Sequence, residues 1–424
     1  MQNRLPTGVA LAVAMGLAWT APDPAWAQLN AASVGTRVLQ DPAVKAALEI
    51  AKTSEPQTIE TQISVCQIEA PPFKEGKRGE LLARLFREAG LMHVRTDRVG
   101  NVLGERPGAQ PHPNLVLTAH LDTVFPEGTD VRVTREGAML RGPGIGDDCR
   151  GLAVLVAVIR AMNQANVQTP GTVIFVATVG EEGLGDLRGV KQLFNETLKG
   201  QVDRFVSIDG TGLGITNTAV GSLRYRVTFK GPGGHSYGAF GLSNPIHALG
   251  RAMAAIADFQ VPRDPKTTFS VGRIGGGTSV NAIPFDAWME VDMRSADPSA
   301  LRALDAKFNK AIDDAVRDED ARWNTHVLTV EKTVVGNRPA GQTHPESPIV
   351  RAALSVTNAL GLTTTLDEGS TDSNIAMSLG IPAITIDGGG RGTRSHALDE
   401  AFDTTDSWKG TQRALLLAIA LAQP

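Results

Sequence analysis

Short apolar runs alternate along most of the chain with longer segments of helical periodicity. Each predicted buried strand is an apolar run that ends at a polar or glycine-rich turn. These strands are Asn114–Ala119, Val173–Val179, Arg204–Ile208 and Ala383–Asp387. The helices predicted around them are Pro42–Lys52, Thr58–Gln67, Glu80–Ala89, Gly151–Met162, Leu187–Phe194, Ser347–Leu360, Ser373–Ser378 and Thr405–Ala422. Short strands are also predicted at His93–Arg98 and Asn101–Glu105. This alternation favours an α/β domain with a mostly parallel sheet.

The pattern changes in the middle of the chain, where strands alternate apolar and polar residues. Strands are predicted at Ser222–Lys230, Thr267–Ile274, Ala287–Arg294 and Val327–Val335, with helices at Asn244–Phe259 and Ser299–Val316. A β-α-β-β-α-β order is typical of the ferredoxin-like α+β unit. We therefore expect residues 221–338 to form a small inserted domain, called the lid below. Residues 28–220 and 339–424 would together form the larger domain.

The first 27 residues follow the three-part order of a signal peptide. Arg4 precedes the apolar segment Val9–Trp19, which is too short to span a bilayer, and Ala25-Trp26-Ala27 is a cleavage site of small residues. We expect cleavage near Ala27 and export to the periplasm or the medium. No other stretch approaches 18 consecutive apolar residues, so we expect no membrane anchor.

Charge and cysteine content exclude some classes of protein. The 41 basic and 45 acidic residues are interspersed and give a net charge of −4, which argues against a nucleic-acid-binding protein. Cys66 and Cys149 are the two cysteines, too few for a disulfide scaffold. They could form one bridge, but two small buried thiols are the favoured interpretation.

Residues able to bind metal follow the predicted strands of the larger domain. His120 follows the first strand, the Glu181–Glu182 pair and Asp209 follow later strands, and Asp147 lies in a glycine-rich turn. In open α/β sheets, ligands bind beyond the carboxyl ends of the strands. Imidazoles and carboxylates both serve zinc, so these residues, with His396 near the end of the chain, indicate a metal site.

Six motifs in this order and spacing resemble one known family over essentially the whole mature chain. They are HLDTV, GPGIGDD, GEEGLGD, SIDG, GPGGHS and SHALDE. The chain resembles the dinuclear-zinc aminoacylase/carboxypeptidase family of metallopeptidases, which includes glutamate carboxypeptidase, peptidase T, acetylornithine deacetylase and succinyl-diaminopimelate desuccinylase. The resemblance implies a zinc-hydrolase domain with an inserted lid.

The resemblance also implies a set of metal ligands. His120 and Asp209 would bind one zinc ion, Glu182 and His396 would bind the other, and Asp147 would bridge the two. Cobalt and manganese are alternatives, because ligand type separates these metals poorly.

Two further acidic residues of the same motifs would support catalysis. Asp122 would hold the imidazole of His120, as carboxylates commonly do at zinc sites. Glu181 would be the general base that takes a proton from the metal-activated water and gives it to the leaving amine. Asp148, in contrast, is expected to cap the following helix rather than bind metal.

Residues of the lid would complete the site. His235 would stabilise the oxyanion, in many relatives by reaching into the site of a partner subunit, so a homodimer formed through the lid is expected. Asn281 and Arg294 match residues that hold a substrate carboxylate, a task suited to a guanidinium fork. The Gly388–Gly392 run, including Gly389, could offer backbone N–H groups to the same anion.

One departure from the family pattern lies beside the bridging aspartate. Relatives commonly have a lysine where this chain has Cys149, and Arg150 could supply the charge one position along. The expected function is an exported metallopeptidase, an exopeptidase or carboxypeptidase, acting on short peptides. The alternatives are an N-acyl-amino-acid deacylase, a peptidase T-like enzyme that trims the amino end, and a non-catalytic periplasmic binding protein for peptide or metal.

Overall fold

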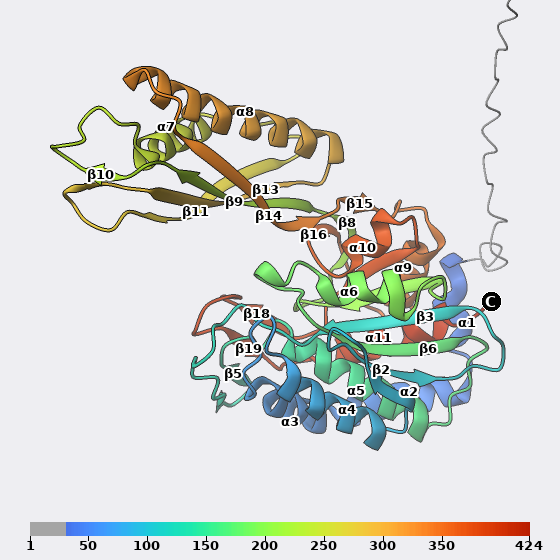
Figure 1. The fold of residues 1–424 in the computed structure, drawn as a ribbon. Helices are drawn as coiled ribbons and strands as arrows, with labels where there is room; N and C mark the ends of the chain where they lie inside the picture. The colour runs from blue at the N-terminus through green and yellow to red at the C-terminus, as the bar shows by residue number, and fades with distance from the viewer. Residues whose placement is uncertain (1–30) are drawn as a thin grey trace, which may run out of the picture.

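The computed structural model describes residues 31–424, which form a larger domain and an elongated lid that projects from it (Figure 1). The predicted signal peptide lies outside the described residues. The α/β fold with a separate α+β lid confirms the predicted fold class. Among the described residues, no helix is long and apolar enough to cross a membrane.

A central mixed sheet organises the larger domain. Its four inner strands run parallel in the order β6-β3-β7-β17. They are β3 (Asn114–His120), β6 (Thr172–Thr178), β7 (Arg204–Ile208) and β17 (Ala383–Ile386). The outer strands are β1 (Met92–Thr96), β2 (Val102–Arg106), β8 (Ile215–Ala219), β15 (Gly341–Gln342) and β16 (Leu366–Gly369). All four strands predicted as buried therefore lie at the centre of the sheet.

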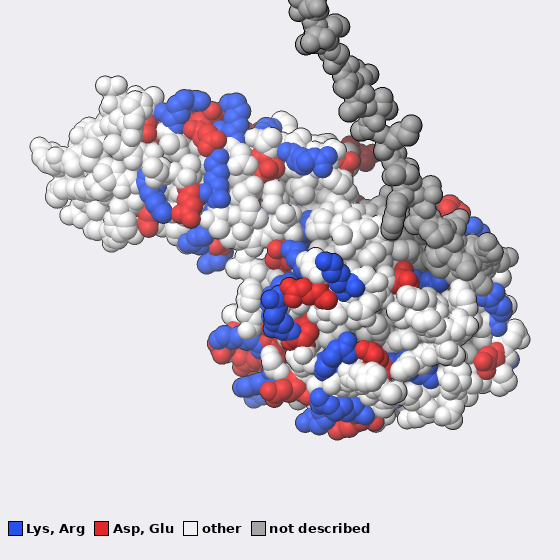
Figure 2. Space-filling view, turned by 45° about the vertical axis from the view of Figure 1, so that its right-hand side comes forward, with Lys and Arg blue, Asp and Glu red and all other residues white. Residues whose placement is uncertain are grey.

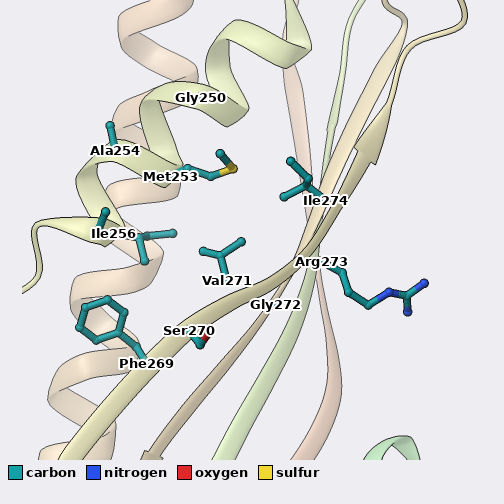
Figure 3. Close-up of a pocket in the computed structure, with 11 residues that line it drawn as sticks. Gly250, Met253, Ala254, Ile256, Phe269, Ser270, Val271, Gly272, Arg273 and Ile274 are labelled. Carbon is teal, nitrogen blue, oxygen red and sulfur yellow. The ribbon is translucent and has the colours of Figure 1, made fainter.

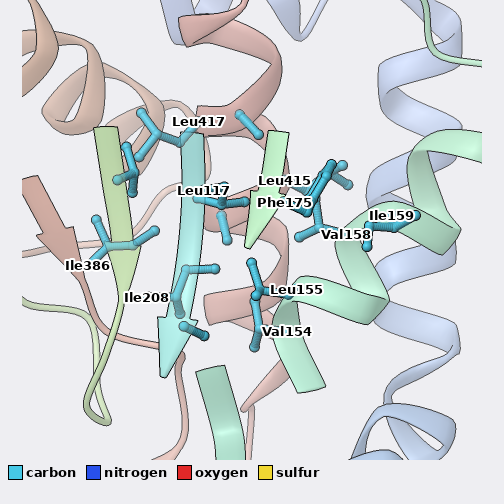
Figure 4. Packing of buried hydrophobic residues seen from close by; sticks show 14 of the residues in the cluster. Leu117, Val154, Leu155, Val158, Ile159, Phe175, Ile208, Ile386, Leu415 and Leu417 are labelled. Carbon is cyan, nitrogen blue, oxygen red and sulfur yellow. The ribbon is translucent and has the colours of Figure 1, made fainter. Parts of the chain in front are cut away.

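Helices cover both faces of this sheet, because side chains of the central strands alternate between two apolar clusters. On β3, Leu115 and Leu117 enter the larger cluster and Val116 enters the smaller one. The larger cluster is formed with α1 (Val34–Val38), α2 (Pro42–Thr53), α3 (Glu55–Cys66), α4 (Gly76–Glu88), α5 (Cys149–Gln164), α9 (Pro348–Ala359) and α11 (Trp408–Leu421). The smaller one is formed with α6 (Arg188–Gln192), η4 (Leu193–Thr197) and α10 (Ser373–Ser378). Figure 4 shows α5 and α11 side chains packed against Leu117 and Phe175.

The lid is a four-stranded antiparallel sheet with two helices on one face. Its strand order is β11-β13-β9-β14. The elements are β9 (Gly221–Lys230), α7 (Pro245–Ala257), β11 (Thr267–Gly276), β13 (Asp286–Ser295), α8 (Pro298–Trp323) and β14 (Thr329–Arg338), with a small pair β10 (Gly234–His235) and β12 (Ala282–Ile283). Asn244 and Asp297 cap the two helices with their side chains, each followed by a proline at the first helical position. The predicted strand and helix order of the lid is confirmed.

A second small sheet beside the central one was not predicted. It consists of β4 (Thr134–Glu136), β5 (Met139–Arg141), β18 (Arg391–Thr393) and β19 (Ala401–Asp403). Strands of three residues are too short to show a period of two, and this sheet joins segments far apart in the chain.

The surface view agrees with the interspersed charges, since acidic and basic residues alternate over the visible face (Figure 2).

Candidate metal centre

Residues from three neighbouring strands meet at one edge of the central sheet. His120 is the last residue of β3, Glu181 and Glu182 follow β6, and Asp209 follows β7. These three strands are parallel, so their carboxyl ends lie side by side. His120, Glu181 and Glu182 are buried.

Asp147 lies at the centre of the cluster, in the loop before α5. Its Oδ1 is 3.0 Å from Nε2 of His120, and its Oδ2 is 3.1 Å from Nε2 of His396. Nε2 of His396 is also 3.0 Å from Oε1 of Glu182, and Nε2 of His120 is 3.9 Å from Oδ1 of Asp209. The structure thus brings together all five residues expected to bind metal, with one oxygen of Asp147 facing each histidine.

The chemistry of this cluster suits divalent cations. One ligand atom from each of His120, Asp147 and Glu182 lies within 4.8 Å of the others. Hydrogen bonds to Asp147 and Glu182 raise the pKa of His396 to about 10. Burial opposes the charged form of His120, but the Asp147 hydrogen bond and nearby carboxylates outweigh it and raise its pKa. The carboxylates therefore favour positive charge at both imidazoles. The same negative surroundings would favour a bound metal cation.

Asp122 orients the loop after β6 as well as His120. Its Oδ1 accepts the N–H of Glu181 at 3.0 Å, and its Oδ2 accepts the N–H of Glu182 at 2.8 Å. Nδ1 of His120 lies 3.0 Å from the backbone oxygen of Asp122 and 3.8 Å from its carboxylate. The backbone of Asp122 is therefore the nearer partner of the imidazole, and its carboxylate positions the two glutamates.

Glu400, the last residue of the SHALDE motif, holds the loop that carries Asp147. Its carboxylate accepts the N–H groups of Gly144 (3.1 Å), Gly146 (2.8 Å) and Asp147 (3.2 Å). The motif resemblance assigned no role to Glu400. Asp148 caps α5 by accepting the N–H of Gly151 at 3.0 Å, which confirms the expectation for it.

Arg338 is a second residue that sequence reasoning missed. It ends β14, where the chain leaves the lid, and its Nη1 is 2.9 Å from Oε1 of Glu181. The side chains of both residues are at most 6% exposed. Burial raises the pKa of Glu181 well above its ordinary value, and the charge of Arg338 acts against that rise. The feature of the sequence that could have indicated a role for Arg338 is its position just before Pro339, where the chain leaves the lid.

Two of the lid residues expected to contact substrate lie away from this cluster. His235 and Asn281 lie at the end of the lid farthest from the larger domain, in and beside the β10–β12 pair (Figure 1). Arg294 lies on the open face of the lid sheet, 2.7 Å from Asp292. The N–H of Gly389 donates to the oxygen of Gly212 at 3.0 Å, so in this structure it is already used.

Cys149 and Arg150 are both fully buried at the start of α5. The buried thiols of Cys66 and Cys149 are free, and the thiol of Cys66 donates to the backbone oxygen of Pro143 at 3.4 Å. Nη1 of Arg150 lies 2.8 Å from Oε1 of Glu55, and both side chains are buried. The charge of Arg150 is therefore used inside the fold.

Comparison with known proteins gives consistent matches. The model of peptidase family M20/M25/M40 matches residues 116–420. A succinyl-diaminopimelate desuccinylase of Nitrosospira multiformis is 26% identical over 62% of this chain and 74% of that protein. A probable carboxypeptidase of Paracoccidioides brasiliensis is 28% identical over 55% of this chain and 59% of that protein. The crystal structure of aminopeptidase PepT from Bacillus cereus shares the fold with a TM-score of 0.67 and 21% identity, covering 86% of this chain and 98% of that one.

Proposed function

Because the chain belongs to peptidase family M20/M25/M40, we propose that it is an exported zinc-dependent enzyme that hydrolyses short peptides or N-acyl amino acids. Membership of the family makes it a metal-binding hydrolase of C–N bonds. The zinc ions, the substrates and the export are the proposed parts.

The position of Asp147 carries the proposal. A carboxylate with one oxygen 3.0 Å from one imidazole and the other 3.1 Å from a second imidazole is suited to bridging two cations. His120 and Asp209 lie on one side of it, and His396 and Glu182 lie on the other. A protein that only bound peptide would have no need of Glu181 buried beside such a cluster.

The residues of the chain would divide the reaction between them. Bound zinc ions would supply positive charge that polarises a carbonyl and makes water more acidic. Glu181 would accept the proton of the attacking water at one carboxylate oxygen and return it to the nitrogen of the leaving amine. Arg338 would hold the other oxygen, Oε1, and so fix the direction in which Glu181 faces. Asp122 would hold Glu181 and Glu182 in position by accepting hydrogen bonds from their N–H groups.

Peptidase and deacylase activity remain the two candidates for the reaction. The desuccinylase relative favours removal of an acyl group, and the probable carboxypeptidase favours cleavage at a free carboxyl end. Both substrates present an amide beside a carboxylate, so Arg294 would serve either as the residue that holds the carboxylate.

We also propose a homodimer formed through the lid. His235 lies too far along the lid to serve the metal centre of its own chain in this arrangement (Figure 1). Edge strand β11 and α7 border an apolar groove of about 650 Å³, with Met253, Val271 and Ile274 directed toward each other (Figure 3). Ile274 is 58% exposed, and a second lid seated on this edge would cover it. Ile274→Asp should then convert a dimer to a monomer in light scattering.

Export is supported by the leader-like order of residues 1–27. N-terminal sequencing of the mature protein from a bacterial host should begin near Gln28. A chain that keeps Met1 in the soluble fraction would contradict this part.

The decisive experiment is hydrolysis of a mixed panel by the zinc-loaded enzyme. The panel holds dipeptides, tripeptides and N-acyl amino acids, each with a free and a blocked carboxyl end. Turnover of substrates with a free carboxylate, lost in Glu181→Ala, would support a carboxypeptidase or deacylase. Cleavage that requires a free amino end would indicate an aminopeptidase. Absence of turnover with two zinc ions bound would refute the proposed function.

A further inference from the structure

The last two residues of β14, where the chain leaves the lid, both bind the loop 181–187, called the base loop below. Arg338 binds Glu181 through the contact described above, and its Nη2 also donates to the backbone oxygen of Glu181. Asn337 is held through its backbone. Its N–H donates to Oδ1 of Asp186 at 2.7 Å, and its oxygen accepts a hydrogen bond from Nζ of Lys191 at 3.0 Å. Because β14 is an edge strand of the lid sheet, these two side chains lie where a further strand would otherwise pair.

Asp186 and Lys191 also bind each other. Nζ of Lys191 lies 2.6 Å from Oδ2 of Asp186, and Lys191 belongs to α6, so the pair spans the turn between the base loop and that helix. A partly exposed ion pair contributes little to stability by itself. This pair, however, also holds both the N–H and the oxygen of one backbone residue, Asn337. It therefore fixes the direction in which the chain enters Arg338.

The turn at the end of the base loop has a strained backbone. Asp186 has a φ of 53° and Leu187 a φ of 56°, which is the left-handed region that residues other than glycine rarely adopt. Such residues persist only where their surroundings fix them. The side chain of Leu187 is fixed by burial in the smaller apolar cluster, and that of Asp186 is fixed by Asn337 and Lys191. Loss of the Asp186 carboxylate would therefore let the turn relax.

A third contact holds the middle of the base loop. Nη1 of Arg224, on β9, donates to the backbone oxygen of Gly183. β9 begins where the chain enters the lid, and it pairs with β14. The base loop is thus bound by the strand that enters the lid and by the strand that leaves it, at the place where the lid meets the larger domain (Figure 1).

We propose that Asp186 is a positioning residue that sets the direction of Glu181 through the lid. Asp186 fixes the backbone of Asn337, which places the guanidinium of Arg338, and that guanidinium holds Oε1 of Glu181. The GEEGLGD motif ends at Asp186, but the motif resemblance assigned no role to it. This inference rests on the proposed hydrolytic function and adds how the general base of that site is positioned. A shift of the lid would move Asn337 and Arg338 together, so the rate would depend on where the lid lies.

Two substitutions of Asp186 test the hydrogen bond to Asn337. Asp186→Ala removes the acceptor, whereas Asp186→Asn keeps an oxygen that can accept the N–H of Asn337. On zinc-loaded enzyme we expect Asp186→Ala to lower kcat at least about tenfold with KM within about twofold, because misplacing a catalytic group by about 1 Å can cost about 10²-fold. Asp186→Asn should keep kcat within about threefold of wild type. A loss in Asp186→Asn as large as that in Asp186→Ala would overturn the proposed role of this hydrogen bond.

Asp406 offers a matched control on the larger domain. It also has a left-handed backbone, with a φ of 57°, and its Oδ2 also lies 2.6 Å from a lysine, Lys409. Asp406→Ala therefore repeats the loss of an ion pair and of a left-handed aspartate, and kcat should stay within about twofold of wild type. Lys191→Met removes the other half of the pair without altering the strained turn. It should lower kcat severalfold, and it keeps the inference testable if Asp186→Ala does not fold.

A double substitution tests whether Asp186 acts through Glu181. In the Glu181→Gln enzyme, adding Asp186→Ala should lower the residual rate by no more than about twofold, since residues that act through one group are not additive. A further tenfold fall would show that Asp186 acts on some other part of the site, and it would overturn the inference.

Hydrogen–deuterium exchange separates this inference from the proposed function. The N–H groups of Glu181 and Glu182 donate to Asp122, so their exchange in the zinc-loaded protein reports how firmly the base loop is held. Asp186→Ala should speed exchange of the base loop, and Asp406→Ala should not. That result would support the role of Asp186 even if the wild-type protein hydrolysed nothing, an outcome that refutes only the proposed function. Wild-type exchange in Asp186→Ala, or wild-type kcat in that variant of an active enzyme, would overturn the inference.

Discussion

Glu400 provides the sharpest test of how the loop before α5 presents Asp147. Its Oε1 accepts the N–H groups of Gly146 and Asp147, its Oε2 accepts the N–H of Gly144, and the residue is 2% exposed. We predict that Glu400→Gln weakens metal binding with little loss of stability. Glu400→Ala should weaken both.

The two substitutions differ because of what happens to the three N–H groups. Burial and the charge of Asp147 raise the pKa of Glu400 to about 7, so the ionised form of this carboxylate is destabilised at its buried position. Glutamine keeps one oxygen for Gly146 and Asp147, but its NH2 group leaves the N–H of Gly144 without an acceptor at about 1–3 kcal/mol, a cost that is partly offset because no charge is buried. Alanine leaves three donors without an acceptor at about 1–3 kcal/mol each, so we expect a loss of about 3 kcal/mol or more.

Metal affinity should respond to both changes, because the loop positions the bridging ligand. Loss of a partner that orients a metal ligand typically lowers metal affinity about 10–100-fold. Competition with a chromogenic chelator measures zinc affinity, and denaturant unfolding of the metal-free protein measures stability, with the exposed Glu346→Gln as control. Wild-type zinc affinity in Glu400→Gln would refute the reasoning, and so would equal destabilisation by glutamine and alanine.

Four further predictions follow from the same structure. Glu181→Gln should lower kcat at least about 10²-fold, the scale of general-base catalysis, while equilibrium dialysis still finds the wild-type zinc content. Removal of zinc with a chelator should abolish turnover and lower the melting temperature, because metal binds the folded state and not the unfolded chain, and added zinc should restore both. Leu117→Ala, at a fully packed position of β3, should lower the free energy of unfolding by about 2–5 kcal/mol in denaturant titration, whereas a loss under 1 kcal/mol would contradict the packing. The thiols of Cys66 and Cys149 should resist a thiol reagent in the native protein and both react after unfolding, and a mass two hydrogens lighter would show instead that they are bridged.

The order of elements could be predicted because most of them carry their own pattern. β7 and α10 have the predicted bounds, and β3, β6 and β17 differ from them by a residue at one or both ends. The strands of the lid could be predicted from their alternation of apolar and polar residues, since each strand buries one face against α7 and α8 and leaves the other open. Strands β8 and β16 were missed because they lie near the edge of the sheet, where their polar and apolar residues mix.

Three of the five expected metal ligands could be predicted from the strand rule alone, and the other two, Asp147 and His396, needed the motif resemblance as well. His120, Glu182 and Asp209 follow parallel strands, so the rule that ligands bind at carboxyl strand ends applied to them directly. Asp147 and His396 are 249 residues apart, and their neighbourhood depends on the small sheet in which β19 pairs with β5. No local sequence pattern predicts that pairing, because a strand of three residues buries too few side chains to show a periodic pattern.

The same small sheet explains why Glu400 had no role in sequence reasoning. The loop at Gly142 donates its N–H to the backbone oxygen of Glu400, and three later N–H groups of that loop donate to the Glu400 side chain. One residue thus joins the loop that carries Asp147 to the segment that carries His396. A bridging carboxylate must meet both histidines at once, so its position depends on this long-range contact more than on either segment alone. The zinc affinity of Glu400→Gln therefore measures the part of the site that only the folded structure could reveal.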